Sequence, residues 1–237
     1  TWSAVAGIRY VETESTSKVN QIWLVNLVPS PSKPDEVIAV YSDDYLPVTE
    51  ESSYSDWLPS LNTRLSIRDD LIFRFSMSQS LTRPELDEMS PLTWYYGGQV
   101  DELTGWGSNP DLEPYTSDNI DISLEWYYGE GSYVAGAAFW KDVDGYLGTD
   151  EVGEVVSVPS GTYNYEISRP VNLSSTKIDG IELAWQHMFT NLPGAWSGLG
   201  FIVNATFVDS ESTEVDGETL PLIGLGDSQN LIGFYEY

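Results

Sequence analysis

The sequence offers few residues that could carry covalent or metal chemistry. It holds one histidine, His187, and no cysteine. A lone histidine is more often structural than catalytic, and without cysteine there is neither a thiolate metal site nor a cysteine nucleophile. The chain also contains no nucleophile elbow, phosphate-binding loop or zinc motif. The sequence therefore predicts no catalytic residue, no metal site and no cofactor.

Carboxylates are the one abundant reactive group, with 37 acidic against 10 basic residues and a formal net charge of -27. Nucleic acid is excluded as a partner because phosphate binding needs clustered Lys and Arg. Asp142 and Asp144 alternate as in a calcium loop, but the rest of that spacing is absent. Solvated loops explain most of the acidity. Two alternatives remain: acidic loops that bind divalent cations, and a small hydrolase with paired carboxylates.

Aromatic residues gather in one long polar connection, residues 82–117. It contains Trp94, Tyr95 and Tyr96, followed by two glycines, and then Trp106. Exposed aromatic rings beside glycines can form flat platforms for sugar rings or other apolar faces. We predict a ligand site at Trp94, Tyr95, Tyr96 and Trp106, with an oligosaccharide as the preferred ligand and a metal chelate or vitamin as alternatives. The competing interpretation is that these rings pack the loop on itself or belong to the extracellular aromatic girdle of a membrane barrel.

The segments around this loop alternate apolar and polar residues with a period of two, which is typical of strands. Leu61 to Ile67 and Leu71 to Met77 show the pattern around the turn signal Asp69-Asp70. Repeats of it predict about eight strands of about 10 to 14 residues. The first covers about residues 2–13 and the last about 229–237. On the polar face, Arg64, Arg68 and Arg74 are expected to balance Asp121 and Glu125, and His187 falls on the apolar face.

Short and long connections alternate strictly along the chain. The short ones lie at residues 69–70, 129–132 and 190–196, and the long ones at 14–55, 82–117, 148–175 and 209–228. Outer-membrane barrels have this layout, with aromatic girdles at both membrane interfaces. We therefore predict an all-β, antiparallel up-and-down transmembrane β-barrel with long extracellular loops, although a soluble sandwich or lipocalin-like barrel shares the alternation. The candidate girdle residues are Trp2, Tyr10, Trp57, Trp126, Tyr128, Trp185, Phe189 and Trp196.

An ordered series of motifs resembles the C-terminal half of TonB-dependent receptor barrels. The motifs are YSDWLPSLN at 54–62, DDLIFRFS at 69–76, SLTRP at 80–84, SNPDLEP at 108–114, SDNIDISLEWYY at 117–128, FWKDVD at 139–144 and KIDGIEL at 177–183. The resemblance implies a barrel of 22 strands around a plug domain. It also implies active transport of a bulky nutrient across the outer membrane of a Gram-negative bacterium, driven through the TonB complex.

Under this resemblance, residues 1–237 form part of one barrel domain, a fragment from which the plug domain and the remaining strands are absent. The expected partners are outer-membrane lipid and lipopolysaccharide, the TonB complex through the missing plug, and a small-molecule or oligosaccharide ligand. Two other interpretations stay open. One is a soluble all-β carbohydrate-binding module. The other is an intact small outer-membrane barrel, since residues 231–237 alternate and end in the aromatic Tyr237.

Overall fold

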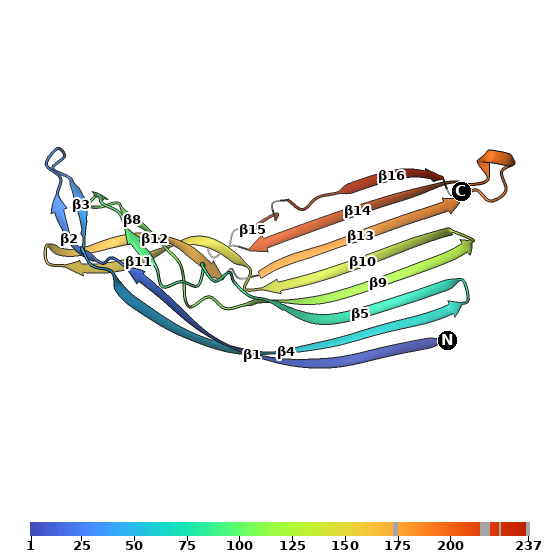
Figure 1. Cartoon of the computed structure of the whole chain (residues 1–237), viewed down its shortest axis with the longest axis horizontal. Helices are drawn as coiled ribbons and strands as arrows, with labels where there is room; N and C mark the ends of the chain where they lie inside the picture. The colour runs from blue at the N-terminus through green and yellow to red at the C-terminus, as the bar shows by residue number, and fades with distance from the viewer. Residues whose placement is uncertain (173–174, 214–218, 223, 236–237) are drawn as a thin grey trace.

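The computed structural model describes residues 1–172, 175–213, 219–222 and 224–235. Within these ranges the regular structure is β-strand, apart from one 3-10 turn, η1 (Gly194–Trp196). No helix in these ranges meets the length and hydropathy needed to cross a bilayer. The molecule is elongated, with a large sheet at one end and a group of small strands at the other (Figure 1).

The large sheet is antiparallel, and its long strands follow one another in chain order. This confirms the predicted all-β, up-and-down architecture with about eight long strands. Its members are β1 (Trp2–Gln21), β4 (Leu46–Arg68), β5 (Leu71–Thr82), β9 (Tyr115–Gly129), β10 (Ser132–Asp144), β13 (Ser175–Met188), β14 (Leu199–Thr213), β15 (Thr219–Leu220) and β16 (Ser228–Tyr235).

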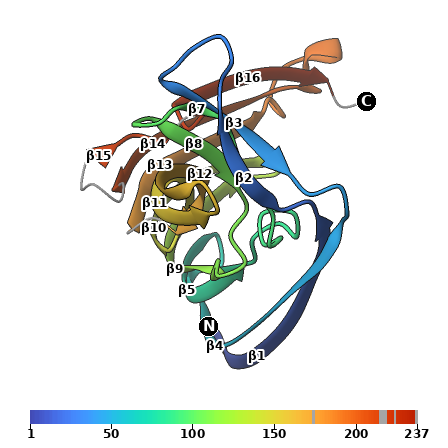
Figure 2. The ribbon, with the colours of Figure 1, turned by 90° about the vertical axis from the view of Figure 1, so that its left-hand side faces the viewer.

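The large sheet is open at both edges. Within the described ranges β1 pairs only with β4, and β16 only with β14. Viewed along the molecule, the sheet forms an arc with β1 and β4 at one end and β16 at the other (Figure 2). An intact eight-stranded barrel requires β1 to pair with β16, so the open arc favours a partial barrel. Tyr237, the predicted end of the last strand, lies outside the described residues.

One face of the large sheet is apolar across every strand. A single row of register partners runs Leu65, Phe73, Leu124, Gly136 and Leu183. No described part of the chain covers this face: Leu124 is 46% exposed and Leu183 is 50% exposed. The apolar rows therefore do not meet across a dry sandwich core. We call this the apolar face, and its members include Trp2, Ile8, Pro59, Leu61, Leu65, Phe73, Phe75, Met77, Ile120, Ile122, Leu124, Val134, Ala138, Trp140, Ile181, Leu183, Phe207 and Leu231.

The register also assigns the faces of β10, where apolar residues occupy both alternating sets of positions. Val134 lies opposite Trp126 and Trp185, and Trp140 lies opposite Ile120. Because side chains alternate along a strand, Val134, Ala138 and Trp140 belong to the apolar face. The residues between them point to the other side, which we call the polar face. It carries Ser3, Asn62, Arg64, Arg74, Ser76, Asp121, Ser123, Glu125, Glu182 and Asn204.

The first long connection is shorter than its polar sequence predicted. β1 continues to Gln21 and β4 begins at Leu46, so the two strands pair over all twenty residues of β1. Polar Ser, Thr and Glu residues fill this extension, where the side chains of β1 alternate between exposed and partly covered positions. Predicted strands of about 10 to 14 residues were therefore too short here, and residues 22–45 form the connection instead of 14–55.

The first three long connections fold into small strands rather than irregular loops. Residues 22–45 contain β2 (Leu24–Pro29) and β3 (Glu36–Tyr41), and residues 83–114 contain β6 (Thr93–Tyr95), β7 (Gly98–Gln99) and β8 (Leu103–Gly107). A hairpin of β11 (Leu147–Val158) and β12 (Gly161–Asn172) completes the group. We call β2, β3, β6, β7, β8, β11 and β12 the small-strand cluster. They form two sheets, ordered β11-β12-β8-β6 and β2-β3-β7.

The three short connections lie where the sequence placed them, at the opposite end of the long strands. Asp69 and Asp70 turn between β4 and β5. Gly131, between β9 and β10, has a φ of 62°, which glycine adopts without steric cost. η1 lies within the third connection. Figure 1 shows these turns beside the chain termini, remote from the small-strand cluster.

Candidate functional site

The small-strand cluster is held together by its own hydrophobic core. Leu27, Val37, Leu103, Tyr165 and Ile167 are buried together, and Ile167 has no exposed surface. They come from four strands: β2 and β3, which are adjacent in sequence, and β8 and β12, which follow much later in the chain. Burial of this kind rigidifies the connections, so the cluster can hold side chains in fixed positions.

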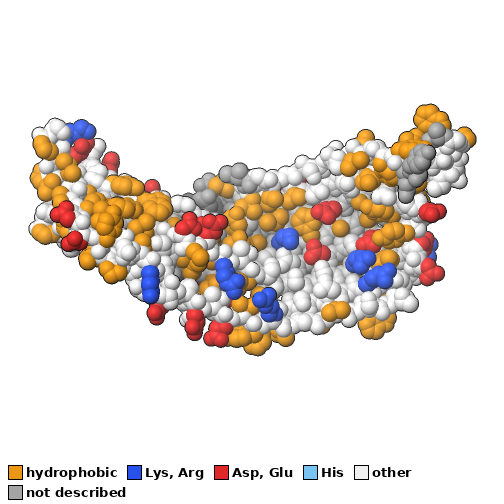
Figure 3. Space-filling view, viewed as in Figure 1, with side chains coloured by type: hydrophobic (Ala, Val, Ile, Leu, Met, Phe, Trp, Pro, Cys, Tyr) orange, Lys and Arg blue, Asp and Glu red, His pale blue; other side chains and the backbone are white. Residues whose placement is uncertain are grey.

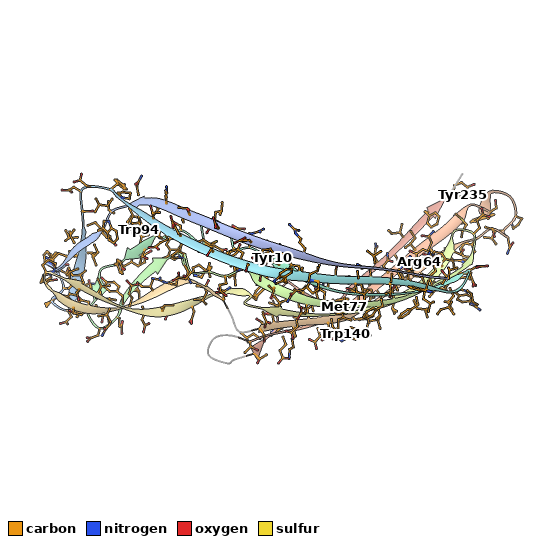
Figure 4. All side chains as sticks on the ribbon, turned by 90° about the horizontal axis from the view of Figure 1, so that it is seen from below. Tyr10, Arg64, Met77, Trp94, Trp140 and Tyr235 are labelled. Carbon is orange, nitrogen blue, oxygen red and sulfur yellow. The ribbon has the colours of Figure 1, made fainter. Side chains whose placement is uncertain are left out.

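Three of the four predicted ligand residues share one face of the cluster. Trp94 lies opposite Trp106 across the β6–β8 pair, and Tyr96 follows Trp94 by two positions. Tyr96 is 52% exposed and Trp106 is 44% exposed. Trp94 lies near Tyr41, with 5.7 Å between ring centroids. Figure 4 shows Trp94 at the end of the molecule remote from Tyr235.

A hollow of about 430 Å³ opens beside Trp94 and Tyr96, and Tyr41, Tyr95, Gly97 and β3 complete its lining. Gly97 permits the close approach of β3, because a Cβ there would lie 2.5 Å from the Val37 carbonyl oxygen. Trp106 lies outside this lining. The structure thus groups Trp94, Tyr95 and Tyr96 at one hollow and leaves Trp106 beside it.

Tyr95 turns its ring away from the exposed face. The ring packs edge-on against Tyr165 at 5.1 Å between centroids, and its hydroxyl donates to Glu154 Oε1 at 2.5 Å. Burial and this hydrogen bond hold the pKa of Tyr95 above its usual range, so the phenol stays protonated and remains a donor. The sequence-based alternative, in which the aromatic residues pack the loop on itself, therefore describes Tyr95.

Glu154 and Arg169 form a second group that the sequence did not reveal. Arg169 Nη2 lies 2.9 Å from Glu154 Oε2, and both side chains border a hollow of about 230 Å³ with Gln21, Trp23 and Tyr95. The Nε atom of Arg169 is buried and has no hydrogen-bond partner among the described residues. Fifteen residues separate the pair in sequence. In the β11–β12 register Glu154 is opposite Tyr165 and Arg169 is opposite Asp150, so the two side chains meet along one face of the hairpin.

The polar face of the large sheet carries a third group of polar side chains. A hollow of about 490 Å³ there is lined by residues that include Asn62, Arg64, Arg74 and Asp121. Arg74 Nε lies 2.7 Å from Glu125 Oε1, as predicted, and Asp121 accepts a hydrogen bond from Ser76 at 3.1 Å. Charged side chains of both signs lie close together over the large sheet (Figure 3).

One predicted charge pairing was wrong. Arg68 contacts Asp70 at 3.2 Å rather than Asp121 or Glu125. A register shift between Ser66 and Arg68 places Arg68 beside the turn and pairs it with Leu71. Because a bulge inserts one residue, the simple alternation of side chains stops applying at that point.

Aromatic side chains mark both ends of the apolar face. Tyr10 and Trp57 are register partners toward the small-strand cluster, with ring centroids 4.8 Å apart. Trp126, Tyr128 and Trp185 lie at the short-turn end, where Trp185 Nε1 donates to the Tyr128 hydroxyl at 2.9 Å. Trp2 and Tyr10 are eight positions apart, or ~27 Å at ~3.4 Å per residue. A tilted barrel strand needs about 9 to 11 residues to cross the hydrocarbon layer, and this spacing matches that number.

His187 belongs to the aromatic group at the short-turn end. Its Nδ1 atom lies 2.9 Å from the Tyr128 hydroxyl, and its ring contacts Phe189 and Phe201. It lies in the same alternating row as Trp185, on the apolar face, as the sequence predicted. Across the described ranges, no group of three or more His, Cys, Asp or Glu side chains could hold a metal ion, and that includes Asp142 and Asp144.

An open antiparallel sheet with one exposed apolar face, one polar face and aromatic rims defines the wall of a membrane β-barrel. The chain belongs to the TonB-dependent receptor family, because the model of the "TonB dependent receptor-like, beta-barrel" domain matches residues 1–227. Receptors of this family lie in the outer membranes of Gram-negative bacteria, and those in the solved structures described next are transport receptors rather than enzymes. No curated protein matches the chain.

Solved structures with a similar fold are receptors for iron- or heme-carrying ligands. The siderophore receptor PirA from Acinetobacter baumannii superposes with a TM-score of 0.59 at 15% identity, over 95% of this chain and 31% of that one. A Serratia marcescens hemophore receptor, HasR, in complex with its hemophore and heme, gives 0.55 at 15% identity, over 97% and 36%. The Pseudomonas aeruginosa ferric enterobactin receptor PfeA in complex with enterobactin gives 0.54 at 18% identity, over 77% and 27%. The chain thus spans about a third of these receptors, and the likeness shows the fold alone.

Proposed function

We propose that this chain forms part of the wall of an outer-membrane receptor that imports a bulky nutrient and performs no reaction chemistry. The observation that carries the proposal is the pair of opposite faces of the large sheet. Leu124 and Leu183 are half exposed on one face, whereas Arg74 and Glu125 pair on the other. Exposed apolar rows are stable against lipid, and polar rows line an aqueous lumen.

The proposed topology follows from the position of the connections. Short turns of barrel strands face the periplasm and long ones face the exterior. The small-strand cluster is then extracellular, and Trp94, Tyr96 and Trp106 are the first aromatic surfaces that an arriving ligand meets. Residues 1–237 are proposed to belong to one barrel domain, with the plug and the remaining strands in other parts of the receptor. The open edges at β1 and β16 support this assignment.

We call the hollow beside Trp94 and Tyr96 the aromatic hollow. The ligand is proposed to be recognised by the aromatic hollow and by the polar face of the large sheet. Trp94, Tyr96 and Trp106 can stack on a flat apolar surface, such as a sugar ring. An oligosaccharide is our preferred ligand class. An iron chelate or heme is the alternative that the names of the similar receptors suggest. Coupling to the TonB complex is proposed to occur through the plug, outside these strands.

The first test is the location of the full receptor. We expect it in the detergent-extracted outer membrane, as a band whose mobility changes on heating. Recovery as a stable monomer in plain buffer would refute the membrane role and favour a soluble binding module.

The second test concerns the ligand site. We would measure binding of maltohexaose, ferric enterobactin and heme to the purified receptor and to the Trp94→Ala and Tyr96→Ala variants. Loss of stacking should weaken binding of the true ligand by roughly 5- to 150-fold per ring, about 1 to 3 kcal/mol, by analogy with aromatic stacking on nucleic-acid bases. Tyr45→Ala is the control, because Tyr45 is 69% exposed and lies outside the hollow. Equal affinities of all variants for each probe would contradict the assignment.

A further inference from the structure

The hollow beside Glu154 and Arg169, of about 230 Å³, lies where the small-strand cluster meets the outer ends of β1 and β4. We call it the junction hollow, and its lining includes Trp23, Glu50, Pro91, Ser108, Glu154 and Arg169. Tyr95 is the one residue that it shares with the lining of the aromatic hollow. Because side chains alternate along β6, Trp94 and Tyr95 point to opposite sides of that strand. The two hollows are therefore separate.

The junction hollow is bordered by hydrogen-bond donors that lack an acceptor among the described residues. Ser108 is 3% exposed, and no described group bonds to its hydroxyl. Gln21 is 7% exposed, and its amide oxygen accepts from the Thr93 N–H at 3.2 Å, which leaves its amide nitrogen as a donor. Arg169 has several N–H donors, and in these ranges only Glu154 accepts from it. Because unpaired polar groups are costly when buried, the hollow favours a ligand that supplies acceptor oxygens.

The charges around the junction hollow favour a neutral ligand. Arg169 is positively charged, whereas Glu154 and Glu50 are negatively charged. The excess of negative charge repels a carboxylate or a phosphate, and Arg169 in turn repels a cation. A hydroxyl group suits both kinds of neighbour, because it accepts from a guanidinium or an amide and donates to a carboxylate.

The apolar part of the lining suits the C–H face of a sugar ring. Trp23 is 42% exposed and borders the hollow together with Pro91 and Pro110. Sites for small polar ligands commonly combine such an aromatic surface with a few polar groups that fix the orientation. The volume lies below the about 300 to 1,000 Å³ of sites for drug-sized ligands, so the hollow admits one ring rather than a chain of rings.

We propose that the junction hollow binds one neutral hexose ring. The inference rests on the extracellular placement of the cluster in the proposed function and adds a second, separate site to it. Ser108, Gln21 and Arg169 donate to the hydroxyl groups of the sugar. Trp23 packs against the ring, and Glu50 accepts a hydroxyl hydrogen. The bound sugar contacts three long connections and the ends of β1 and β4, so it fixes the cluster relative to the long strands.

The test measures binding of D-glucose and D-galactose to the full receptor, purified in a detergent without a sugar headgroup. Ligand-detected NMR should show binding of at least one hexose, and weaker binding of acetate and inorganic phosphate. Trp23→Ala should weaken hexose binding at least about fivefold, because it removes the stacking surface. Ser108→Ala removes only a hydroxyl and should weaken binding about 2- to 12-fold, as expected for one net hydrogen bond.

Tyr45→Ala is the matched control for Trp23→Ala. Tyr45 belongs to the same connection, is 69% exposed and lies outside both hollows, so this variant should bind hexose as the wild type does. Trp94→Ala separates the two hollows, because it disrupts the aromatic hollow and should leave hexose binding at the junction hollow intact. Unchanged hydrogen exchange in β8 and β12 shows that each variant keeps the cluster folded.

Four results would overturn the inference. The first is a wild-type receptor that binds neither hexose, and the second is one that binds acetate or phosphate more tightly than both hexoses. The third is equal hexose affinity of the wild type, Trp23→Ala and Ser108→Ala. The fourth is binding lost with Trp94→Ala and kept with Trp23→Ala, which would place the sugar in the aromatic hollow.

The location of the receptor is measured on the same preparations. A receptor found in the outer membrane that fails the hexose test overturns the junction site alone, whereas absence from the outer membrane overturns the proposed function.

Discussion

The large sheet and the small-strand cluster place their apolar side chains in opposite ways. In the cluster, Leu103, Tyr165 and Ile167 are almost wholly buried, as in a water-soluble domain. In the large sheet, Leu124 and Leu183 are half exposed on a face that no other layer of the described residues covers. Both regions are built of paired β-strands, so the difference lies in the solvent each surface must meet. Under the proposed function, one chain meets two solvents, water around the cluster and hydrocarbon against the apolar face of the sheet.

This division also separates stability from ligand recognition. Under the proposed function, the large sheet obtains its stability from backbone pairing between its strands and from lipid contact on its apolar face, and it needs little core of its own. The cluster lies in water and must bury a core to hold Trp94 and Tyr96 in place. Changes in the cluster core should therefore loosen the candidate site without opening the sheet, and changes on the apolar face should do the reverse.

The largest expected effect is the loss of the cluster core. Ile167→Ala should destabilise the cluster by about 2 to 5 kcal/mol, because Ile167 is completely buried and its removal leaves a cavity. Hydrogen exchange on the full receptor should show faster exchange in β8, β11 and β12 and unchanged exchange in β9 and β10. Val155→Ala on β11 is the control, since Val155 is 68% exposed. Uniform loss of protection in both regions would break the distinction between them.

A charge on the apolar face should have the next largest effect. Leu183→Arg should cost about 2 to 4 kcal/mol in a bilayer. The neighbouring Ala184→Arg should cost little, because Ala184 borders a hollow of about 380 Å³ that also holds Glu125 and Glu182. Unfolding of the two variants in lipid vesicles measures the difference. Equal costs would show that the two faces meet the same solvent.

Alkaline pH should loosen the cluster before the sheet. Burial raises the pKa of Tyr165 to about 12 from an ordinary value near 10. Between these values the unfolded chain has released the proton that the folded cluster retains, so stability falls as pH rises from about 10 to 12. The loss approaches about 2 to 3 kcal/mol at the upper end.

Tyrosinate absorbance and limited proteolysis of the full receptor, followed with pH, check this expectation. Tyr165→Phe should reduce the pH dependence, at the cost of the hydrogen bond from its hydroxyl to the Tyr96 carbonyl, 3.2 Å long. A cluster that keeps its protease resistance at pH 12 would contradict the assignment of Tyr165 as a buried, protonated phenol.

The two regions also differed in how far the sequence predicted them. The hairpin from Leu61 to Met77 followed from its alternation, because membrane strands must present one face to lipid and one to water. The outer halves of β1 and β4 could not be predicted in this way, because their sequences are polar at nearly every position and show no alternation of apolar and polar residues. In the cluster, the aromatic residues were visible by type, but Glu154 and Arg169 were not. Their contact depends on the β11–β12 register, which local sequence does not determine.

The smallest expected effect compares the ion pairs of the two regions. Arg74–Glu125 lies on the polar face with the arginine side chain 47% exposed, whereas Arg169 in the cluster is 18% exposed. Double-mutant cycles with Gln at each position should give about 0.2 to 1 kcal/mol for Arg74–Glu125, falling as salt is added. The Arg169–Glu154 coupling should be larger and less salt-sensitive, because Arg169 is more buried than Arg74; the carboxylates differ in the opposite sense, with Glu154 36% and Glu125 17% exposed. Equal couplings with equal salt dependence would mean that the cluster is as open to water as the barrel lumen, and that its polar group plays no part in fixing the aromatic hollow.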